Sequence, residues 1–358
     1  MSKKANSDLA AVKSDGKTYP YPPSWLDRFT AWVERLPGRS WVFYPALGLV
    51  LAFVVTIVQW RDGSYPIGTF NAFHVWFAIQ IPYFLALIRY LDGAAETALR
   101  NFRPVLNVSE AEYAELSYRI TTAPARPTIL GSLAGVVVAI LIFPAIPHYL
   151  SLLGWSTLPP ALAIAYGLFF LMLWVVGALV YHTMHQLKLV SNIYATQTLV
   201  NLFDLNPLYA FSGFTSKTAV GLILFNYLWF ATAPELLSQP LGIGFGVFYA
   251  VVAAVTFVWP LLGIHRRLVE EKQRLLMEYS QRLAATISEL HGRVDAGEMQ
   301  SMDELHDTMA GLEIERSALT RIPTWPWQPE TLRGFITALL LPVAVFLLQF
   351  ILQRAFGQ

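Results

Sequence analysis

The stretch PALAIAYGLFFLMLWVVGALVYH, residues 160–182, carries no acidic or basic side chain other than its terminal histidine. A helix needs about 20 apolar residues to cross the hydrocarbon core of a bilayer, so this stretch predicts a membrane-spanning helix. The composition agrees, because 55% of the 358 residues are hydrophobic and only 14% are charged, and the mean hydropathy is +0.47. So few charges cannot cover a soluble protein of this size. The sequence therefore predicts an all-α, polytopic integral membrane protein.

Similar apolar runs recur along the chain. Seven candidate spans lie at about 41–60, 68–88, 128–149, 160–182, 217–234, 242–264 and 333–353. When these runs are threaded through a bilayer, 23 of the 25 lysines and arginines fall on the side of the N-terminus. Basic residues concentrate in cytoplasmic loops. We therefore expect the N-terminus inside and the C-terminus outside, in a plasma or inner membrane.

This threading divides the chain into four regions. We expect a cytoplasmic tail with an amphipathic interfacial helix over 1–40, six spans over 41–264, a cytoplasmic helical hairpin over 265–328, and a seventh span within 329–358. In the hairpin region, apolar side chains repeat every seven residues, which is typical of a helix-packing seam. These residues are Val269, Leu276, Leu283 and Leu290. We interpret this seam as the place where subunits assemble.

Several classes of function are disfavoured by what the sequence lacks. It has no cysteine, which removes disulfides, cysteine metal ligands and thiol nucleophiles. A net charge of +1 gives no sign of nucleic-acid binding. No Asp, Glu, Lys or Arg lies deep within the seven runs, which argues against an ion-coupled transporter and against paired-carboxylate chemistry. We accordingly expect no enzyme and no cofactor.

Two histidines at the inner end of the fourth run deserve a separate interpretation. His182 and His185 are three residues apart and could contact one metal ion, with Asp204 as a further ligand. A polar helix end at the interface explains them more simply. We therefore predict no metal site, and a metal-dependent membrane enzyme is the weakest of our interpretations.

A second candidate site lies in the outer half of the predicted bundle. Four aromatic or histidine side chains could border a pocket open to the outside for a small-molecule ligand. These are His74, Trp76, Tyr166 and Trp259. The alternative is an ordinary interfacial aromatic belt, which is common in membrane proteins.

The seventh run has one face that is small or polar. On a helical wheel this face contains Ala338, Pro342, Val345, Gln349 and Gln353. The remaining positions are bulky and apolar. Neutral glutamine dipoles beside an apolar constriction suit a pore that hydrates an ion without holding it tightly. The alternative is that Gln349 and Gln353 only meet the outer membrane interface.

The layout resembles that of the insect odorant and gustatory receptor channels. The resemblance rests on seven spans, an inside N-terminus, cytoplasmic helices before a separate last span, and Gln349-Phe350 late in that span. It departs from that family where Thr337 is followed by Ala338 and not by Tyr. The resemblance implies a homotetramer with an inner anchor domain, and a central cation pore lined by the last span and opened by a small-molecule ligand.

Two main functions remain open from the sequence. The first is a homotetrameric, cation-permeable and ligand-gated channel that conducts inorganic cations along its seventh span. The second is a non-conducting membrane receptor or scaffold whose cytoplasmic helices bind a partner. A facilitator or lipid-handling protein is a further alternative.

Overall fold

A computed structural model describes residues 12–14, 17–198, 201–297 and 302–341. Apart from one short hairpin of strands β1 (Val12–Ser14) and β2 (Lys17–Tyr19), the regular structure of the described residues is helical. Among them are six helices long and apolar enough to cross a membrane. The predicted all-helical class of a membrane protein is thereby confirmed, with six candidate spans among the described residues. Of the seventh predicted run, 333–353, the structure describes only residues up to 341, and the chain is helical from 329 to that point.

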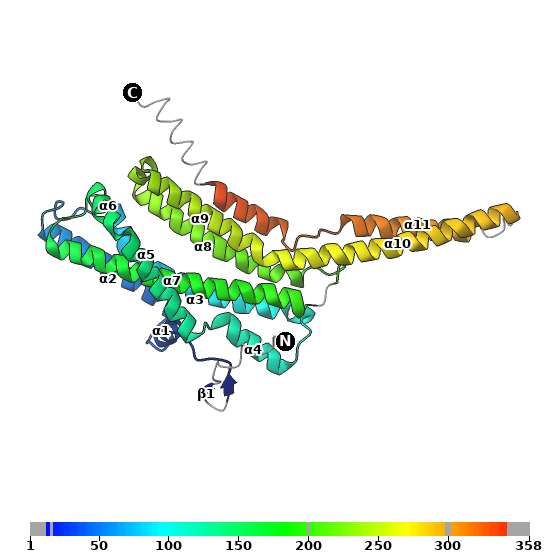
Figure 1. Cartoon of the computed structure of the whole chain (residues 1–358), viewed down its shortest axis with the longest axis horizontal. Helices are drawn as coiled ribbons and strands as arrows, with labels where there is room; N and C mark the ends of the chain where they lie inside the picture. Colours follow the sequence, from blue (N-terminus) through cyan, green and yellow to red (C-terminus); the bar gives the residue numbers. More distant parts are fainter. Residues whose placement is uncertain (1–11, 15–16, 199–200, 298–301, 342–358) are drawn as a thin grey trace, which may run out of the picture.

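The helices follow one another along the chain with short connections (Figure 1). The α-helices are α1 (Trp25–Glu34), α2 (Ser40–Arg61), α3 (Ala72–Phe102), α4 (Glu110–Thr121), α5 (Ala125–Ile142), α6 (Ile146–Leu152), α7 (Pro159–Thr196), α8 (Ala210–Thr232), α9 (Pro240–Val258), α10 (Leu262–Ala296) and α11 (Met302–Arg321). Short 3-10 turns lie at η1 (Arg103–Val105), η2 (Phe143–Ala145), η3 (Pro207–Tyr209), η4 (Pro234–Ser238) and η5 (Trp259–Leu261).

Two helices continue well past the apolar runs that predict them. α3 has 31 residues and α7 has 38, and both extend at the end that we assign to the inside. The added turns are less apolar but remain packed. Phe102 near the end of α3 lies with its ring centroid 5.3 Å from that of Tyr194 on α7 and 4.9 Å from that of Phe211 on α8. Tertiary contacts therefore stabilise helix beyond the bilayer-length segment.

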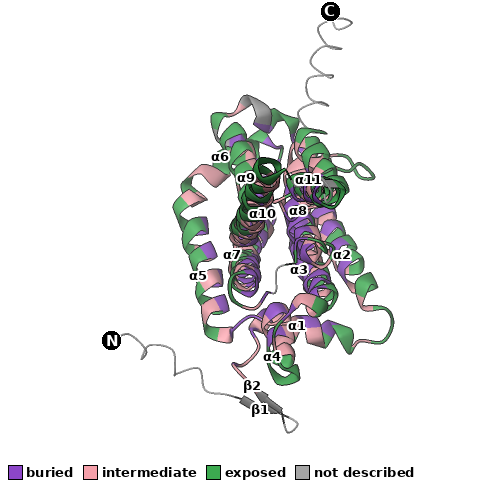
Figure 2. Ribbon diagram, turned by 90° about the vertical axis from the view of Figure 1, so that its right-hand side faces the viewer, coloured by how far each residue is buried: buried purple, intermediate pink, exposed green. Residues whose placement is uncertain are grey.

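Helices α3, α7 and α8 form the centre of the bundle. In Figure 2 their facing sides are buried, whereas α5 and α2 lie on the flanks with more exposed outer faces. α5 packs on α7, α7 on α3, and α2 on α3, while α9 packs on α8. An exposed apolar outer face is expected where helices meet lipid.

The α5–α7 contact depends on three glycines. A Cβ atom added at Gly135 of α5 would lie 2.0 Å from the carbonyl oxygen of Leu173, and one added at Gly177 of α7 would lie 2.2 Å from that of Gly131. Gly131 and Gly135 form a Gly-xxx-Gly pair, which lets helix backbones approach closely in a membrane. Backbone contact therefore replaces side-chain packing at this crossing.

α1 confirms the amphipathic helix predicted before the first span. Ser24 and Asp27 form a reciprocal capping box at its start. Its apolar face is buried within the protein, with Leu26 and Val33 almost fully covered. Trp25 donates its indole N–H to Ser132 Oγ of α5 at 3.2 Å, so α1 is tied to the membrane bundle.

The predicted helical hairpin after the sixth candidate span is also present. α9 passes through the turn η5 into α10, and α11 returns along α10, so that the pair forms an arm beyond the bundle (Figure 1). Gly297 ends α10 with φ of +75°, a left-handed conformation that glycine adopts at little cost.

Candidate functional site

The most distinctive polar site is a buried carboxylate between α3 and α7. His182 of α7 donates its Nε2–H to Asp92 Oδ1 of α3 at 2.7 Å. Asp92 is 5% exposed and His182 is 1% exposed. Buried carboxylates of this kind are costly unless they are paired and hydrogen-bonded. The pair is therefore a functional candidate rather than an incidental contact.

Gln186, one turn after His182, completes the cluster. Its side-chain amide donates both to Asp92 Oδ1 at 2.9 Å and to the carbonyl oxygen of Ile120 at 2.8 Å. Ile120 belongs to α4, so the cluster joins two spanning helices to a helix outside the apolar runs. Within the described structure, His182 Nδ1 and Gln186 Oε1 have no hydrogen-bond partner although both are buried. Each of these two atoms can form one further hydrogen bond, for example to a water molecule.

A second set of polar contacts lies beside this cluster and ties down the N-terminal segment. His185 Nε2 lies 3.1 Å from the carbonyl oxygen of Arg119 and 3.2 Å from the Tyr21 hydroxyl. Tyr21 in turn donates to the carbonyl oxygen of Thr122 at 2.8 Å. His182 thus bonds to α3, whereas His185 bonds to α4 and to the segment before α1. The two histidines therefore connect α7 to different neighbouring segments.

Asp27 of α1 contributes a further acidic group near the cluster. Its Oδ2 accepts hydrogen bonds from the backbone N–H of Ser24 at 2.9 Å and from that of Ala123 at 3.2 Å. Burial nevertheless raises the pKa of the Asp27 carboxyl above its ordinary value of 3.8, while the positive field of His182 lowers it. Burial also raises the pKa of Tyr118 to about 12. This end of the bundle thus holds several titratable groups in a poorly solvated setting.

The seven apolar runs contain no acidic residue at depth, but the helices extend beyond these runs and one of them buries a carboxylate. Asp92 falls four residues after the predicted run 68–88, but α3 continues through it and buries it. The sequence did contain a signal, because His182 and Gln186 are four residues apart and so share one face of the helix. The acidic partner on α3 could not be identified from that spacing.

The proposed metal ligands are not brought together. His182 points to Asp92, His185 points to Arg119 and Tyr21, and Asp204 lies in the loop before η3. Among the residues that the structure describes, no three His, Asp or Glu side chains are placed to hold one metal ion.

The four residues of the predicted outer pocket are also not all brought together. His74 is fully buried, with its ring centroid 4.4 Å from that of Trp155, and Trp76 packs on Phe225. Tyr166 packs on Phe143. Trp259 lies in η5, at the opposite end of α9 from the turn that joins it to α8, and is 41% exposed. Trp259 therefore lies apart from the other three side chains, of which Trp76 and Tyr166 pack in the same hydrophobic cluster.

Part of the predicted assembly seam is used inside the hairpin. Leu276 and Leu283 of α10 pack against a buried cluster that includes Leu312 and Leu319 of α11. Even so, all four seam residues, Val269, Leu276, Leu283 and Leu290, remain only half-buried with α11 in place. The hairpin thus leaves apolar surface uncovered along the seam.

The segment between α11 and the last helical stretch forms an aromatic elbow. Trp325 stacks on His265 with centroids 3.9 Å apart and on Trp327 with centroids 4.4 Å apart. His265 Nδ1 also bonds to the carbonyl oxygen of Thr324 at 2.9 Å. These contacts fix the direction in which residues 329–341 leave the hairpin and run beside α9 (Figure 1).

The last stretch contacts the bundle through one face. Phe335 stacks on Phe257 of α9 with centroids 4.4 Å apart, and Ala338 packs against the same cluster. Ile336 and Leu340, by contrast, are exposed. Of the predicted pore-lining residues, Ala338 thus lies toward its own bundle. Pro342, Val345, Gln349 and Gln353 lie outside the described residues.

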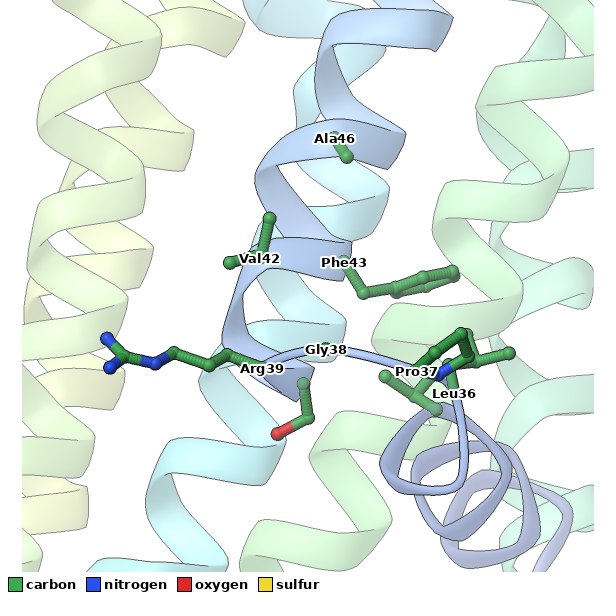
Figure 3. Close-up of a pocket in the computed structure, with 9 residues that line it drawn as sticks. Leu36, Pro37, Gly38, Arg39, Val42, Phe43 and Ala46 are labelled. Carbon is green, nitrogen blue, oxygen red and sulfur yellow. The ribbon is translucent and has the colours of Figure 1, made fainter.

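A cavity of about 340 Å³ lies where α1 connects to α2. Its lining is largely apolar and includes Val33, Leu36, Val42 and Phe43. Figure 3 shows Arg39 extending away from the side of the cavity where Phe43 and Leu36 lie. The cavity therefore brings together no set of polar groups that could orient a substrate.

No protein-family model, curated protein or solved structure matches this chain. Its function must therefore be argued from the geometry above.

Proposed function

We propose that this chain is a self-associating membrane receptor or scaffold whose α10–α11 hairpin is its interaction module. The observation that carries this proposal is the hairpin itself, which continues a spanning helix into an arm beyond the bundle (Figure 1). Its seam stays half-buried after α11 has packed. Outside the bilayer, water surrounds such an arm, and apolar surface that water would otherwise contact favours association.

Two exposed residues give the proposal a clean test. Met277 of α10 is 61% exposed and Ile314 of α11 is 72% exposed, so neither holds the hairpin together. A second copy of the hairpin would cover them, and an aspartate at either position would then be buried without a partner. Asn107, exposed in the loop before α4 and outside the hairpin, provides the control position.

The experiment measures the mass of the full chain in detergent by light scattering. We expect an oligomer for the native chain and for Asn107→Asp, and a shift toward monomer for Met277→Asp combined with Ile314→Asp. Circular dichroism checks that the helices persist. A native chain that is already monomeric would overturn self-association, and the hairpin would then have to act on a different partner.

A homotetrameric cation channel is the second candidate. It is favoured by the one-sided packing of residues 329–341, which leaves the exposed face free to meet another subunit. One observation argues against the channel. Ala338 belongs to the predicted pore face but packs against its own bundle.

Cysteine accessibility separates the channel from the scaffold. The native chain has no cysteine, so a single introduced thiol is read without background. If the last span lines a pore, cysteines at Pro342, Val345 and Gln349 should react with a water-soluble reagent, and those at Leu340 and Leu347 should not. Cation flux into liposomes should then fall for Gln349→Leu. Uniform reactivity around the helix, or none, would contradict the channel.

A further inference from the structure

A second cavity, of about 270 Å³, lies between α3, α8 and the segment that leads into the last helical stretch. Its polar lining comes from elements far apart in the sequence. It includes Thr97, Asn101, Asn206, Lys217, Gln328 and Thr331. Hydroxyl and amide groups that converge in this way can donate hydrogen bonds to one ligand.

The cavity has a net positive character. Lys217 is the only charged residue among those lining it, and its ammonium group lies 5.9 Å from the centroid of the Tyr90 ring. Within the described part of the chain, Lys217 forms no ion pair with a carboxylate. Glu96 and Glu330, which are close in sequence to lining residues, do not line the cavity. The ammonium is therefore free to pair with an anion.

The position of the cavity relative to the apolar segments indicates the kind of anion. Lys217 is the first residue of the apolar run 217–234, and Thr97 lies beyond the apolar part of α3, close to Arg100 and Arg103. Tyr90 beside it is 54% exposed. A lysine, arginines and an exposed tyrosine at the end of apolar helices are typical of the headgroup layer.

We propose that this cavity binds the phosphate group of an anionic phospholipid from the inner leaflet. Lys217 neutralises the phosphate, and the side-chain amides of Asn101 and Gln328 donate to its oxygens. Basic pockets between membrane helices on the cytoplasmic side suit such headgroups. Since Gln328 and Thr331 directly precede or begin the last helical stretch, the lipid would connect that stretch to α3 and α8. This inference does not depend on self-association.

The test uses the full chain in nanodiscs of phosphatidylcholine, with or without phosphatidylglycerol, and in detergent titrated with short-chain phosphatidylglycerol. We expect phosphatidylglycerol to raise the thermal midpoint of the native chain. Lys217→Gln should weaken binding about fivefold, the effect of about 1 kcal/mol per basic residue. Lys188→Gln, which removes an exposed lysine of α7 that does not line the cavity, is the control and should bind normally.

Two further variants test the site without removing the charge of residue 217. Lys217→Arg, which keeps the charge, should retain binding, and Asn101→Leu, which keeps Lys217 but removes an amide, should weaken it. These variants decide the matter even if Lys217→Gln folds poorly. Inorganic phosphate alone should have little effect on the thermal midpoint. Equal responses of Lys217→Gln and Lys188→Gln to phosphatidylglycerol would overturn the site, and stabilisation by free phosphate without added effect of lipid would overturn the lipid as its ligand.

Discussion

His182 Nε2 on α7 lies 2.7 Å from Asp92 Oδ1 on α3, although the two residues are 90 positions apart in the chain. Both side chains are buried, and Gln186 ties the same carboxylate to α4. A single acidic group thus connects two spanning helices with α4, a helix outside the apolar runs. Its loss should affect the whole inner end of the bundle.

Removing one member of this pair should therefore be costly. His182→Ala leaves the Asp92 carboxylate buried with only Gln186 as a partner, and breaking a buried pair in this way costs about 3–5 kcal/mol. Glu96→Ala removes an exposed carboxylate one turn away on α3 and should change stability by about 0.5 kcal/mol or less. Denaturant titration of the detergent-solubilised chain measures both. Equal effects of the two substitutions would show that the buried pair does not stabilise the fold.

The raised pKa of Asp27 predicts a pH dependence with a definite sign. A carboxyl whose pKa is higher in the folded than in the unfolded chain adds stability below its ordinary value of 3.8 and loses it as pH rises through the raised value. Asp27→Asn removes the charge, so the variant should have a higher thermal midpoint than the native chain at pH 7. The difference between the two midpoints should shrink as the pH falls toward the raised pKa of Asp27. A variant that is less stable at pH 7 would mean that the hydrogen bonds to Ser24 and Ala123 outweigh burial.

The glycine contact between α5 and α7 predicts a steric effect at the glycines of the crossing and none at a glycine elsewhere on α7. Gly135→Ala places a methyl group where the Leu173 carbonyl oxygen stands, so the two backbones must separate. Gly167→Ala on α7 is the matched control, since a Cβ there meets no atom within 4 Å. We expect the first to lower the thermal midpoint and the yield of folded protein, and the second to leave both unchanged. Equal losses in the two variants would show that the backbone contact at Gly135 is not the cause, because alanine favours helix over glycine at both positions.

The aromatic elbow predicts that Trp327 controls the position of the last helical stretch. Trp327→Ala removes the ring between Trp325 and Phe257, whose centroids lie 4.4 Å and 5.6 Å away. A cysteine at Ala338, which packs against the bundle, should then react faster with a water-soluble thiol reagent. Trp41→Ala removes an exposed ring on α2 and should not change that rate. An unchanged rate in Trp327→Ala would show that the elbow does not hold the stretch in place.

Local properties of the sequence determined the membrane class, six of its spanning helices, the amphipathic α1 and the hairpin that extends the sixth span. Apolar length, helical periodicity and turn residues are readable within about 20 consecutive positions, because a helix satisfies its backbone hydrogen bonds within its own segment. The sequence has no strong helix breaker between the sixth apolar run and the repeat that begins at Val269, so the continuation of the helix could be predicted for the same reason.

Only the tertiary structure decided what the polar residues do. Asp92 became buried because α3 continues beyond its apolar run to pack with α7 and α8, and its pairing with His182 depends on the relative rotation of two helices. The four residues of the predicted outer pocket do not all lie together, because Trp259 lies at the other end of α9. The lysine-containing cavity joins residues from positions 97 to 331. Helix register and crossing distance set such contacts, and these depend on side-chain packing between segments that no short stretch of sequence contains.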